Sequence, residues 1–165
     1  MNKIQVSIII VSYNTKELLK KCLKSMTNDQ WLMANTETIF VDNNSTDGSR
    51  EFLKKLVNGQ SSIINHQSLK FIFNDENLGF AKANNQGIKQ AKGKYILLLN
   101  SDTEVKPEAL SILVDYLANN PQTTAVSPML LNMDGSKQID YYMKFPNLWQ
   151  MTFYHNGILR PIIMH

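Results

Sequence analysis

The triplet Asn100-Ser101-Asp102 follows directly after an apolar run at residues 95–99. Such a run does not alternate apolar and polar side chains, so we expect a buried strand that is covered on both faces, as in a parallel sheet. A carboxylate just past the carboxyl end of such a strand points into the crevice where open α/β sheets bind ligands. Asp102 is therefore a candidate for holding a divalent cation against a diphosphate, because hard cations prefer carboxylate oxygens. The alternative is that Asp102 only caps the turn or the next helix.

A second carboxylate, Asp42, ends an earlier apolar segment and begins the polar loop 42–48. It could accept a hydrogen bond from the imide nitrogen of a base or from a ribose hydroxyl, as acidic residues do in nucleotide-binding sheets. The alternative is an Asx-turn, in which the side chain serves only its own loop. Asp47 in the same loop is predicted to cap the following helix rather than to touch a ligand.

Two further segments carry side chains that could contact a ligand. Tyr13 leaves the first apolar segment and could stack on a base, or it could belong to the core. Gly79 allows a close approach of the backbone to a ligand, and amides at positions 84 and 85 follow it in a helical pattern. Lys82 could reach a phosphate or could simply be solvated. The three histidines lack metal-ligand spacing, and we treat them as bystanders.

Alternating strands and helices must position these residues. We expect strands at residues 6–11, 38–41, 69–73 and 95–99, and helices that begin after Asn14, at Ser49, at Ala81 and at Pro107. Asn14 and Glu17 have the spacing of a capping box. Gly93 is predicted to be the C′ residue of the third helix, and Pro107 to occupy the tolerated first position of the fourth.

Apolar positions at helical spacing predict which helix faces point inward. These positions include Leu18 in the first helix and Val57 in the second. Residues 125–127 and a hairpin around Asp134-Gly135 are expected to add to the edge of the sheet.

The strand–helix alternation predicts an α/β fold with a mostly parallel central sheet flanked by helices and joined by right-handed crossovers. The residues suited to ligand binding all follow predicted strands. Because the carboxyl ends of parallel strands share one edge of the sheet, we expect these side chains to gather there.

Composition limits the functional classes. The chain has 165 residues, 43% hydrophobic and 19% charged, which fits one globular domain, and its net charge of +3 is too small to indicate a nucleic-acid partner. Cys22 is the single cysteine, so an intrachain disulfide is excluded and a reducing, cytoplasmic compartment is the default. We expect its thiol to be buried and structural. The sequence has no Gly-rich phosphate loop, which speaks against a sugar nucleotidyltransferase and leaves the phosphates to a metal or basic side chains.

Four ordered segments resemble family 2 glycosyltransferases with the GT-A-type fold. They are residues 7–14 (SIIIVSYN), 41–48 (VDNNSTDG), 77–81 (NLGFA) and 99–103 (LNSDT). The segment 126–136 (VSPMLLNMDGS) is similar to the rhamnosyltransferase-like branch, and the resemblance covers roughly residues 4–147.

The resemblance implies a nucleotide-sugar site. Its residues would be Ser12, Tyr13, Asn14, Asp42, Asn44, Asn77, Gly79, Phe80, Lys82, Asn85, Asn100, Ser101 and Asp102. Residues 12, 13 and 42 would hold the base and ribose. Residues 100–102 would be the Asp-x-Asp motif that binds Mg²⁺ or Mn²⁺ on the diphosphate, with Asn100 in place of the first Asp and Asp102 as the main ligand. The implied reaction is sugar transfer, with inversion, from a UDP- or dTDP-linked sugar to a saccharide or lipid-linked acceptor.

Inverting transfer also needs a general base, which the family supplies from an acidic segment well after the Asp-x-Asp motif. The last acidic residue here is Asp140, and residues 141–165 contain none. We therefore expect residues 1–140 to form the nucleotide-sugar-binding domain, and the chain to be truncated before the acceptor segment. A nucleotide-sugar-binding module without transfer activity is the alternative.

Six aromatic residues crowd into positions 141–154. Such a patch marks an interface, a membrane-facing surface or the stump of a missing part, and we favour the stump. Self-association through this tail and peripheral association with the inner face of the membrane both stay open. The expected role is donor binding in an enzyme that builds a surface polysaccharide.

Overall fold

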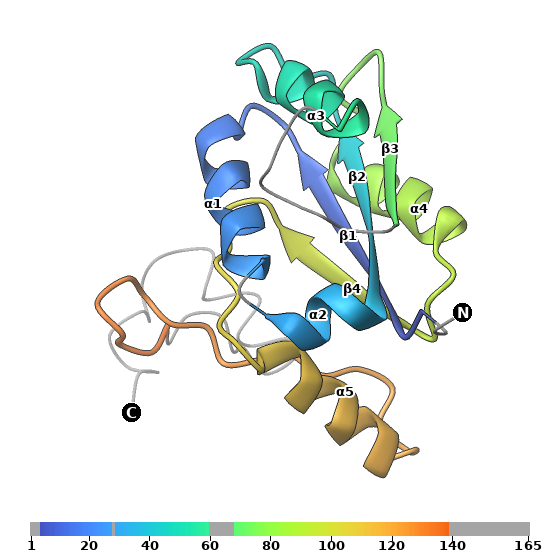
Figure 1. Cartoon of the computed structure of the whole chain (residues 1–165), viewed down its shortest axis with the longest axis vertical. Helices are drawn as coiled ribbons and strands as arrows, with labels where there is room; N and C mark the ends of the chain where they lie inside the picture. Colours follow the sequence, from blue (N-terminus) through green and yellow to red (C-terminus); the bar gives the residue numbers. More distant parts are fainter. Residues whose placement is uncertain (1–3, 28, 60–67, 139–165) are drawn as a thin grey trace, which may run out of the picture. The chain divides into compact units, whose positions relative to one another are not determined.

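The computed structural model describes residues 4–27, 29–59 and 68–138 (Figure 1). The chain divides into two compact units, Met1–Val126 and Ser127–His165, and each is described by itself. The elements are β1 (Val6–Ser12), α1 (Lys16–Met26), α2 (Gln30–Asn35), β2 (Thr36–Asp42), α3 (Ser49–Val57), β3 (Leu69–Phe73), α4 (Phe80–Gln90), β4 (Tyr95–Asn100) and α5 (Ala109–Asn119). The predicted boundary at residue 140 and the aromatic tail after it lie outside the described residues.

The strands form one parallel sheet in the order β3-β2-β1-β4, which confirms the predicted α/β fold with a parallel sheet and flanking helices. β3 has the predicted bounds, and β1 and β4 each run one residue further. In register, Ser12 pairs with Asp42, Asp42 with Phe73, and Val11 with Asn100. The strands therefore end in one row along the carboxyl edge.

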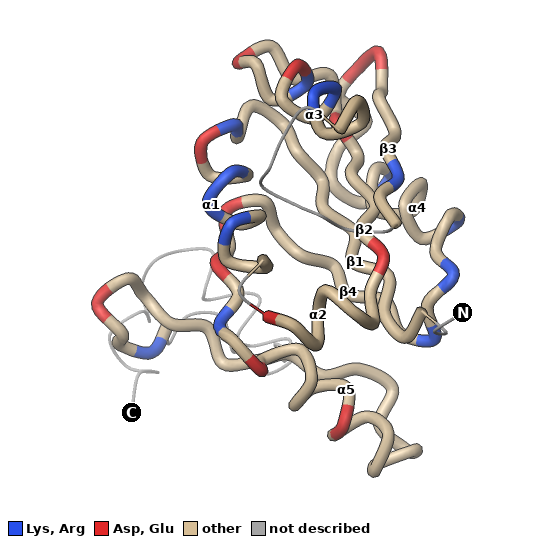
Figure 2. The backbone as a smooth tube through the Cα atoms, viewed as in Figure 1, with Lys and Arg blue, Asp and Glu red and all other residues tan. Residues whose placement is uncertain are grey.

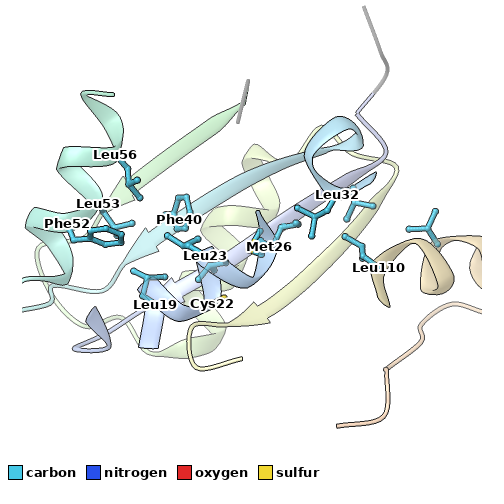
Figure 3. Packing of buried hydrophobic residues seen from close by; sticks show 14 residues of the cluster. Leu19, Cys22, Leu23, Met26, Leu32, Phe40, Phe52, Leu53, Leu56 and Leu110 are labelled. Carbon is cyan, nitrogen blue, oxygen red and sulfur yellow. The ribbon is translucent and has the colours of Figure 1, made fainter. Parts of the chain in front are cut away.

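One face of the sheet is covered by α1, α2, α3 and α5, whose apolar side chains pack against β-strand residues such as Ile8, Ile10 and Phe40 (Figure 3). Burial of each such aliphatic side chain contributes about 1.5–3 kcal/mol relative to exposure. Leu18 and Val57, which were predicted to face inward, are 45% and 52% exposed because they lie beside the buried stripe of their helices. The lysines of α1 are exposed or partly exposed, and Figure 2 shows basic positions along this helix.

The other face is covered by α4, which packs over β1 and β2 through a smaller cluster around Ile9, Ile39 and Ala83. On the same face of β4, Ile96 and Leu98 are 46% and 48% exposed. The prediction that both faces of β4 are covered is therefore wrong for the part of the chain that the structure describes. A continuous apolar run indicates what a strand is able to bury, but β4 lies at the edge of this sheet, whereas α4 packs mainly over β1 and β2.

The predicted capping box at the start of α1 is wrong. Thr15, not Asn14, is the N-cap residue, and it makes no side-chain capping bond. Asn14 has a φ of 54°, and its Oδ1 accepts the backbone N–H of Thr46 at 2.8 Å. The Asn14 side chain therefore bonds to Thr46, which lies 32 residues away, instead of capping the helix that follows it.

Two other predicted helix ends also differ. α4 ends at Gln90 with Ala91 as its C-cap, so Gly93 is not the C′ residue. A Cβ at Gly93 would lie 2.5 Å from the backbone nitrogen of Ser7, so glycine is required by the close approach of two backbones. α5 begins at Ala109, not at Pro107, because the intervening Glu108 has a φ of 65°.

In the second unit, the described residues contain the predicted hairpin turn at Asp134-Gly135. Leu131 and Lys137 form an antiparallel bridge across it, and Gly135 has a φ of 84°. Residues 125–127 form no strand, so that prediction is wrong. Among the helices of the described ranges, none combines the length and apolar character needed to span a membrane.

A buried carboxylate ties the amino edge of the sheet to the chain after α4. Glu37 Oε1 accepts the hydroxyl of Ser7 and the backbone N–H of Lys92, each at 2.6 Å, and Oε2 lies 2.8 Å from Lys70 Nζ. Lys70 Nζ also donates to the carbonyl of Gln90 at 2.7 Å. Burial raises the pKa of Glu37, but the Lys70 ammonium, the Ser7 hydroxyl and the Lys92 amide together outweigh burial, and the pKa lies below its ordinary value of 4.5.

Replacement of this carboxylate should destabilise the fold in a pH-dependent way. We expect Glu37→Gln to lower the free energy of unfolding by about 2–3 kcal/mol at neutral pH, since hydrogen bonds to a buried charge are lost. Because the pKa of Glu37 is lower in the folded state than in the unfolded state, its contribution is complete above about pH 4.5 and is lost as the pH falls through the folded-state pKa. Urea unfolding over a pH series measures this.

The matched control is Glu76→Gln, at an exposed loop carboxylate, which should change stability by less than about 0.5 kcal/mol. A stability difference between Glu37→Gln and wild type that stays constant down to pH 3.5 would contradict the assignment.

Candidate functional site

A cleft of about 440 Å³ opens at the carboxyl edge of the sheet. It is lined by Val11, Tyr13, Thr15, Asn43, Asn77, Gly79, Phe80, Asn100, Ser101 and Asp102. Each strand of the sheet contributes its end or the loop that follows it, as the row of strand ends requires. The volume is in the range typical of small-molecule sites.

The cleft brings together part of the predicted site. The predicted residues that line it are Tyr13, Asn77, Gly79, Phe80, Asn100, Ser101 and Asp102. The predicted residues that do not line it are Ser12, Asn14, Asp42, Asn44, Lys82 and Asn85. Val11, Thr15 and Asn43 line it without having been predicted. Asn43 directly follows Asp42, so the end of β2 was the available signal for it.

The loop after β1 is fixed by the loop after β2. The Asn14 N–H donates to Ser45 Oγ at 3.0 Å, and the Lys16 N–H donates to Asp47 Oδ2 at 2.9 Å. These bonds hold Tyr13 at the cleft with 48% of its surface exposed, so it is not a core residue. Its aromatic face is available for stacking.

The prediction that Asp47 caps the next helix is not confirmed as stated, because the N-cap residue of α3 is Gly48 and Asp47 precedes it. Asp47 Oδ1 accepts the N–H of Ser49, the first residue of α3, at 2.9 Å. Burial raises the pKa of Asp47, but the hydrogen bonds from Ser49 and the Lys16 N–H together outweigh burial and hold the pKa below the ordinary value. The side chain therefore serves both loops rather than a ligand.

Asp42 is completely buried at the end of β2. Its Oδ2 accepts the N–H of Ser45 at 3.2 Å and lies 3.8 Å from Arg50 Nε, so half of the carboxylate serves its own loop. The bond reaches the third residue on rather than the second, so it is not the Asx-turn of the alternative prediction. Asp42 Oδ1 has no hydrogen-bond partner among the described residues. Because a buried polar atom is rarely left unpaired, this oxygen retains the capacity to accept a bond from a ligand.

The turn after β4 is held from beneath by α1 and the start of α2. Cys22 Sγ donates to the carbonyl of Asn100 at 3.9 Å, and Ser25 Oγ accepts the N–H of Val105 at 2.8 Å. Asp29 Oδ2 accepts the N–H of Glu108 at 3.0 Å. The exposed Asp102 carboxylate therefore projects from a loop that is fastened on both sides.

The donor set at Asp102 was tested for its fit to a metal ion. Asp102 is the one acidic residue among the described residues that line the cleft. No group of three or more His, Cys, Asp or Glu that could hold a metal occurs within residues 4–27, 29–59 and 68–138. Mg²⁺ is commonly bound through one or two carboxylates together with substrate phosphates. The residues therefore fit a cation that binds together with a diphosphate.

An open parallel α/β sheet with a polar cleft at its carboxyl edge is the arrangement of nucleotide-binding proteins. The sequence matches the family described as "Glycosyl transferase family 2" over residues 7–162. The chain belongs to this family, and its class of enzyme is the glycosyltransferases.

Curated relatives of the chain are themselves glycosyltransferases. An uncharacterized glycosyltransferase of Haemophilus influenzae is 27% identical over 163 residues, which are 97% of this chain and 48% of the relative. The poly(ribitol-phosphate) beta-glucosyltransferase of Bacillus spizizenii is 34% identical over 106 residues, which are 64% of this chain and 16% of the relative. The chain thus spans about half, or less, of the length of these relatives.

Two solved structures share the fold. A mannosyltransferase from Pyrobaculum calidifontis in complex with GDP-Man and Mn²⁺ superposes with a TM-score of 0.59 at 22% identity, covering 69% of this chain and 32% of that chain. S. aureus TarS 1-349 in complex with UDP-GlcNAc superposes with a TM-score of 0.61 at 22% identity, covering 76% and 38%. These neighbours confirm the GT-A-type fold.

The thiol beneath the cleft should be unreactive in the folded protein. Burial raises the pKa of Cys22 to about 12, with smaller contributions from the nearby Asp102 and Glu104 carboxylates. Because only the thiolate reacts, we expect alkylation by iodoacetamide at pH 8 to be more than about 100-fold slower than that of glutathione. Mass spectrometry of timed samples measures the rate, and the protein unfolded in urea should react readily. Native labelling as fast as that of glutathione would show that α1 does not pack under the turn as described.

Proposed function

We propose that this chain forms the donor-binding part of a family 2 glycosyltransferase, of the rhamnosyltransferase-like branch, that uses a nucleoside diphospho-sugar and inverts the transferred centre. One observation carries the proposal: a single cleft joins the exposed ring of Tyr13, the loop at Asn77-Gly79 and the carboxylate of Asp102, which come from the ends of different strands. UDP- and dTDP-linked sugars are the proposed donors.

The strand order determines which end of the cleft would hold the base and which would hold the diphosphate. Neighbouring strands lie about 4.8 Å apart, so the ends of β3 and β4 are separated by three spacings, or roughly 14 Å. With the diphosphate at Asp102, beside β4, the base would lie toward β2 and β3. There the unpaired Oδ1 of Asp42 would accept the imide N–H that uracil and thymine share, provided that the groups that bury it move aside when the nucleotide binds. Tyr13, at the end of β1, would stack on the base or ribose.

Mg²⁺ or Mn²⁺ bound between Asp102 and the diphosphate would act as a Lewis acid on the departing diphosphate. The chain's own contribution is to hold the Asp102 carboxylate in place, through the bonds of Cys22 and Ser25 to its loop. Asn100 lines the cleft as a neutral side chain, so Asp102 carries the negative charge of the motif there. A solved neighbour with GDP-Man and Mn²⁺ supports this use of a divalent cation.

The general base would come from outside the described residues, because Asp102 is the one acidic side chain among those that line the cleft and it is assigned to the cation. The proposed acceptor is a saccharide or lipid-linked chain at the cytoplasmic face of the membrane. Support for this acceptor class comes from relatives whose names denote polymer synthesis, such as a poly-beta-1,6-N-acetyl-D-glucosamine synthase of Staphylococcus epidermidis, 28% identical over 122 residues.

Isothermal titration calorimetry tests the donor site. We expect UDP or dTDP to bind, Mn²⁺ to raise the affinity by about tenfold or more, and Mn²⁺ alone to give no measurable binding, because one carboxylate is too few ligands for a cation. Asp102→Asn should remove the gain from Mn²⁺ without lowering the melting temperature, since Asp102 is exposed.

Glu104→Gln is the matched control, because Glu104 is an exposed carboxylate nearby that does not line the cleft. It should bind UDP and Mn²⁺ as the wild type does. Absence of binding to every nucleotide, with or without Mn²⁺, would refute the proposal. Donor binding without any sugar transfer to a lipid-linked acceptor would instead favour a binding module.

A further inference from the structure

A series of amide side chains, each hydrogen-bonded to the next, connects the middle of α4 with the cleft. Gln86 and Asn74 exchange two hydrogen bonds, Nδ2 of Asn74 to Oε1 of Gln86 at 2.8 Å and Nε2 of Gln86 to Oδ1 of Asn74 at 2.9 Å. Asn74 Nδ2 also donates to Asn43 Oδ1 at 2.9 Å, and Asn43 Nδ2 donates to Asn77 Oδ1 at 3.0 Å. We call Gln86, Asn74, Asn43 and Asn77 the amide relay.

The middle of the amide relay is buried and its end is open. Asn43 is 2% exposed and Asn74 is 8% exposed, whereas Asn77 is exposed and lines the cleft. Buried amides that are fully paired hold one arrangement, because any turned-over amide would leave unpaired groups away from water. The relay therefore transmits a fixed orientation from α4 to a cleft residue.

Backbone groups decide which end of each amide is oxygen. The N–H of Gly79 can only donate, and it lies 2.9 Å from Asn77 Oδ1, so this atom must be an acceptor. The Asn43 atom that faces it must then be the nitrogen, which also faces the carbonyl of Gly79 at 3.4 Å. The oxygen of Asn43 in turn accepts the N–H of Leu78 at 3.4 Å. This one set of orientations satisfies every contact.

Both donors that reach Asn77 use its oxygen, and its Nδ2 donates to none of the described residues. The nitrogen is therefore the polar atom that Asn77 can offer to a ligand. Since Asn77 follows β3, it stands at the end of the cleft where the proposed direction of the nucleotide places the base.

We infer that Gln86, Asn74 and Asn43 are positioning residues that hold Asn77 with its amide nitrogen toward a carbonyl oxygen of the nucleotide base. The inference rests on the proposed function, because it requires a nucleotide in the cleft. It adds the polarity of the contact: Asn77 donates, so the ligand must present an acceptor.

A double-mutant cycle tests whether Gln86 acts through Asn77. Gln86→Met should raise the Kd of UDP with Mn²⁺ about five- to tenfold, the effect of losing one well-placed hydrogen bond. In an Asn77→Ala background the same substitution should raise the Kd less than about twofold, because the group that it positions is absent. Gln90→Met, at an exposed side chain on the same helix, is the control and should change the Kd less than about twofold in either background.

Additive effects would overturn the inference, because a general loosening of the fold weakens binding equally in both backgrounds. If the wild type binds UDP but the two substitutions have additive effects, the positioning role of the amide relay is refuted and the proposed function is not. Wild type that binds no nucleotide refutes the proposed function, and the role of the amide relay with it.

A second variant tests the polarity without dismantling the amide relay. Asn77→Asp keeps the oxygen that accepts from Asn43 and Gly79 and replaces the donor by a second acceptor. We expect UDP binding to fall about tenfold or more with an unchanged melting temperature. The loss should disappear with ribose 5-diphosphate, which has no base. UDP binding equal to wild type, or the same loss with ribose 5-diphosphate, would overturn the assignment.

Discussion

The alignment of the strand ends is the constraint on which the site depends. Because β1, β2, β3 and β4 are parallel and in register, the chain must leave the sheet at one edge after every strand. Polar residues that are far apart in the sequence, such as Tyr13 and Asp102, are thereby placed around one cleft without any local motif holding them together. The apolar runs that make the strands are thus the physical cause of the site.

Loops on such an edge would be mobile if nothing fastened them. Here the loop after β2 fastens two of the others, the loop after β1 through Ser45 and the loop after β3 through Asn43, and α1 fastens the turn after β4. The fastening groups are short and polar, and they bond mostly to backbone, so they fix position without filling the cleft. A preorganised site loses little conformational entropy when a ligand binds.

Elements that depend on local sequence patterns could be predicted, whereas the roles of side chains that bond to distant residues could not. The strand at residues 69–73 and the start of the helix at Ser49 were predicted as the structure has them, because apolar periodicity is a local signal. Asn14 was misassigned because its partner lies 32 residues away. Asn43 was missed although it follows Asp42 at the end of β2, because its hydrogen bonds to Asn74 and Asn77 are tertiary contacts that the spacing does not show. The short helix α2 was also missed, although Asp29 is a normal N-cap for it.

The free edge of β4 and its half-exposed face determine where a further strand could join the sheet. In the described residues β4 has a neighbour, β1, on one side, and Ile96 and Leu98 are half-exposed on one face. An outermost strand with open apolar side chains readily accepts another strand alongside it. A parallel strand added there would end beside Asp102 and an antiparallel one would begin there, so in both cases one terminus of the added strand would lie next to the cleft. The sheet can therefore be enlarged beside β4 while the ends of β1, β2 and β3 keep their places around the cleft.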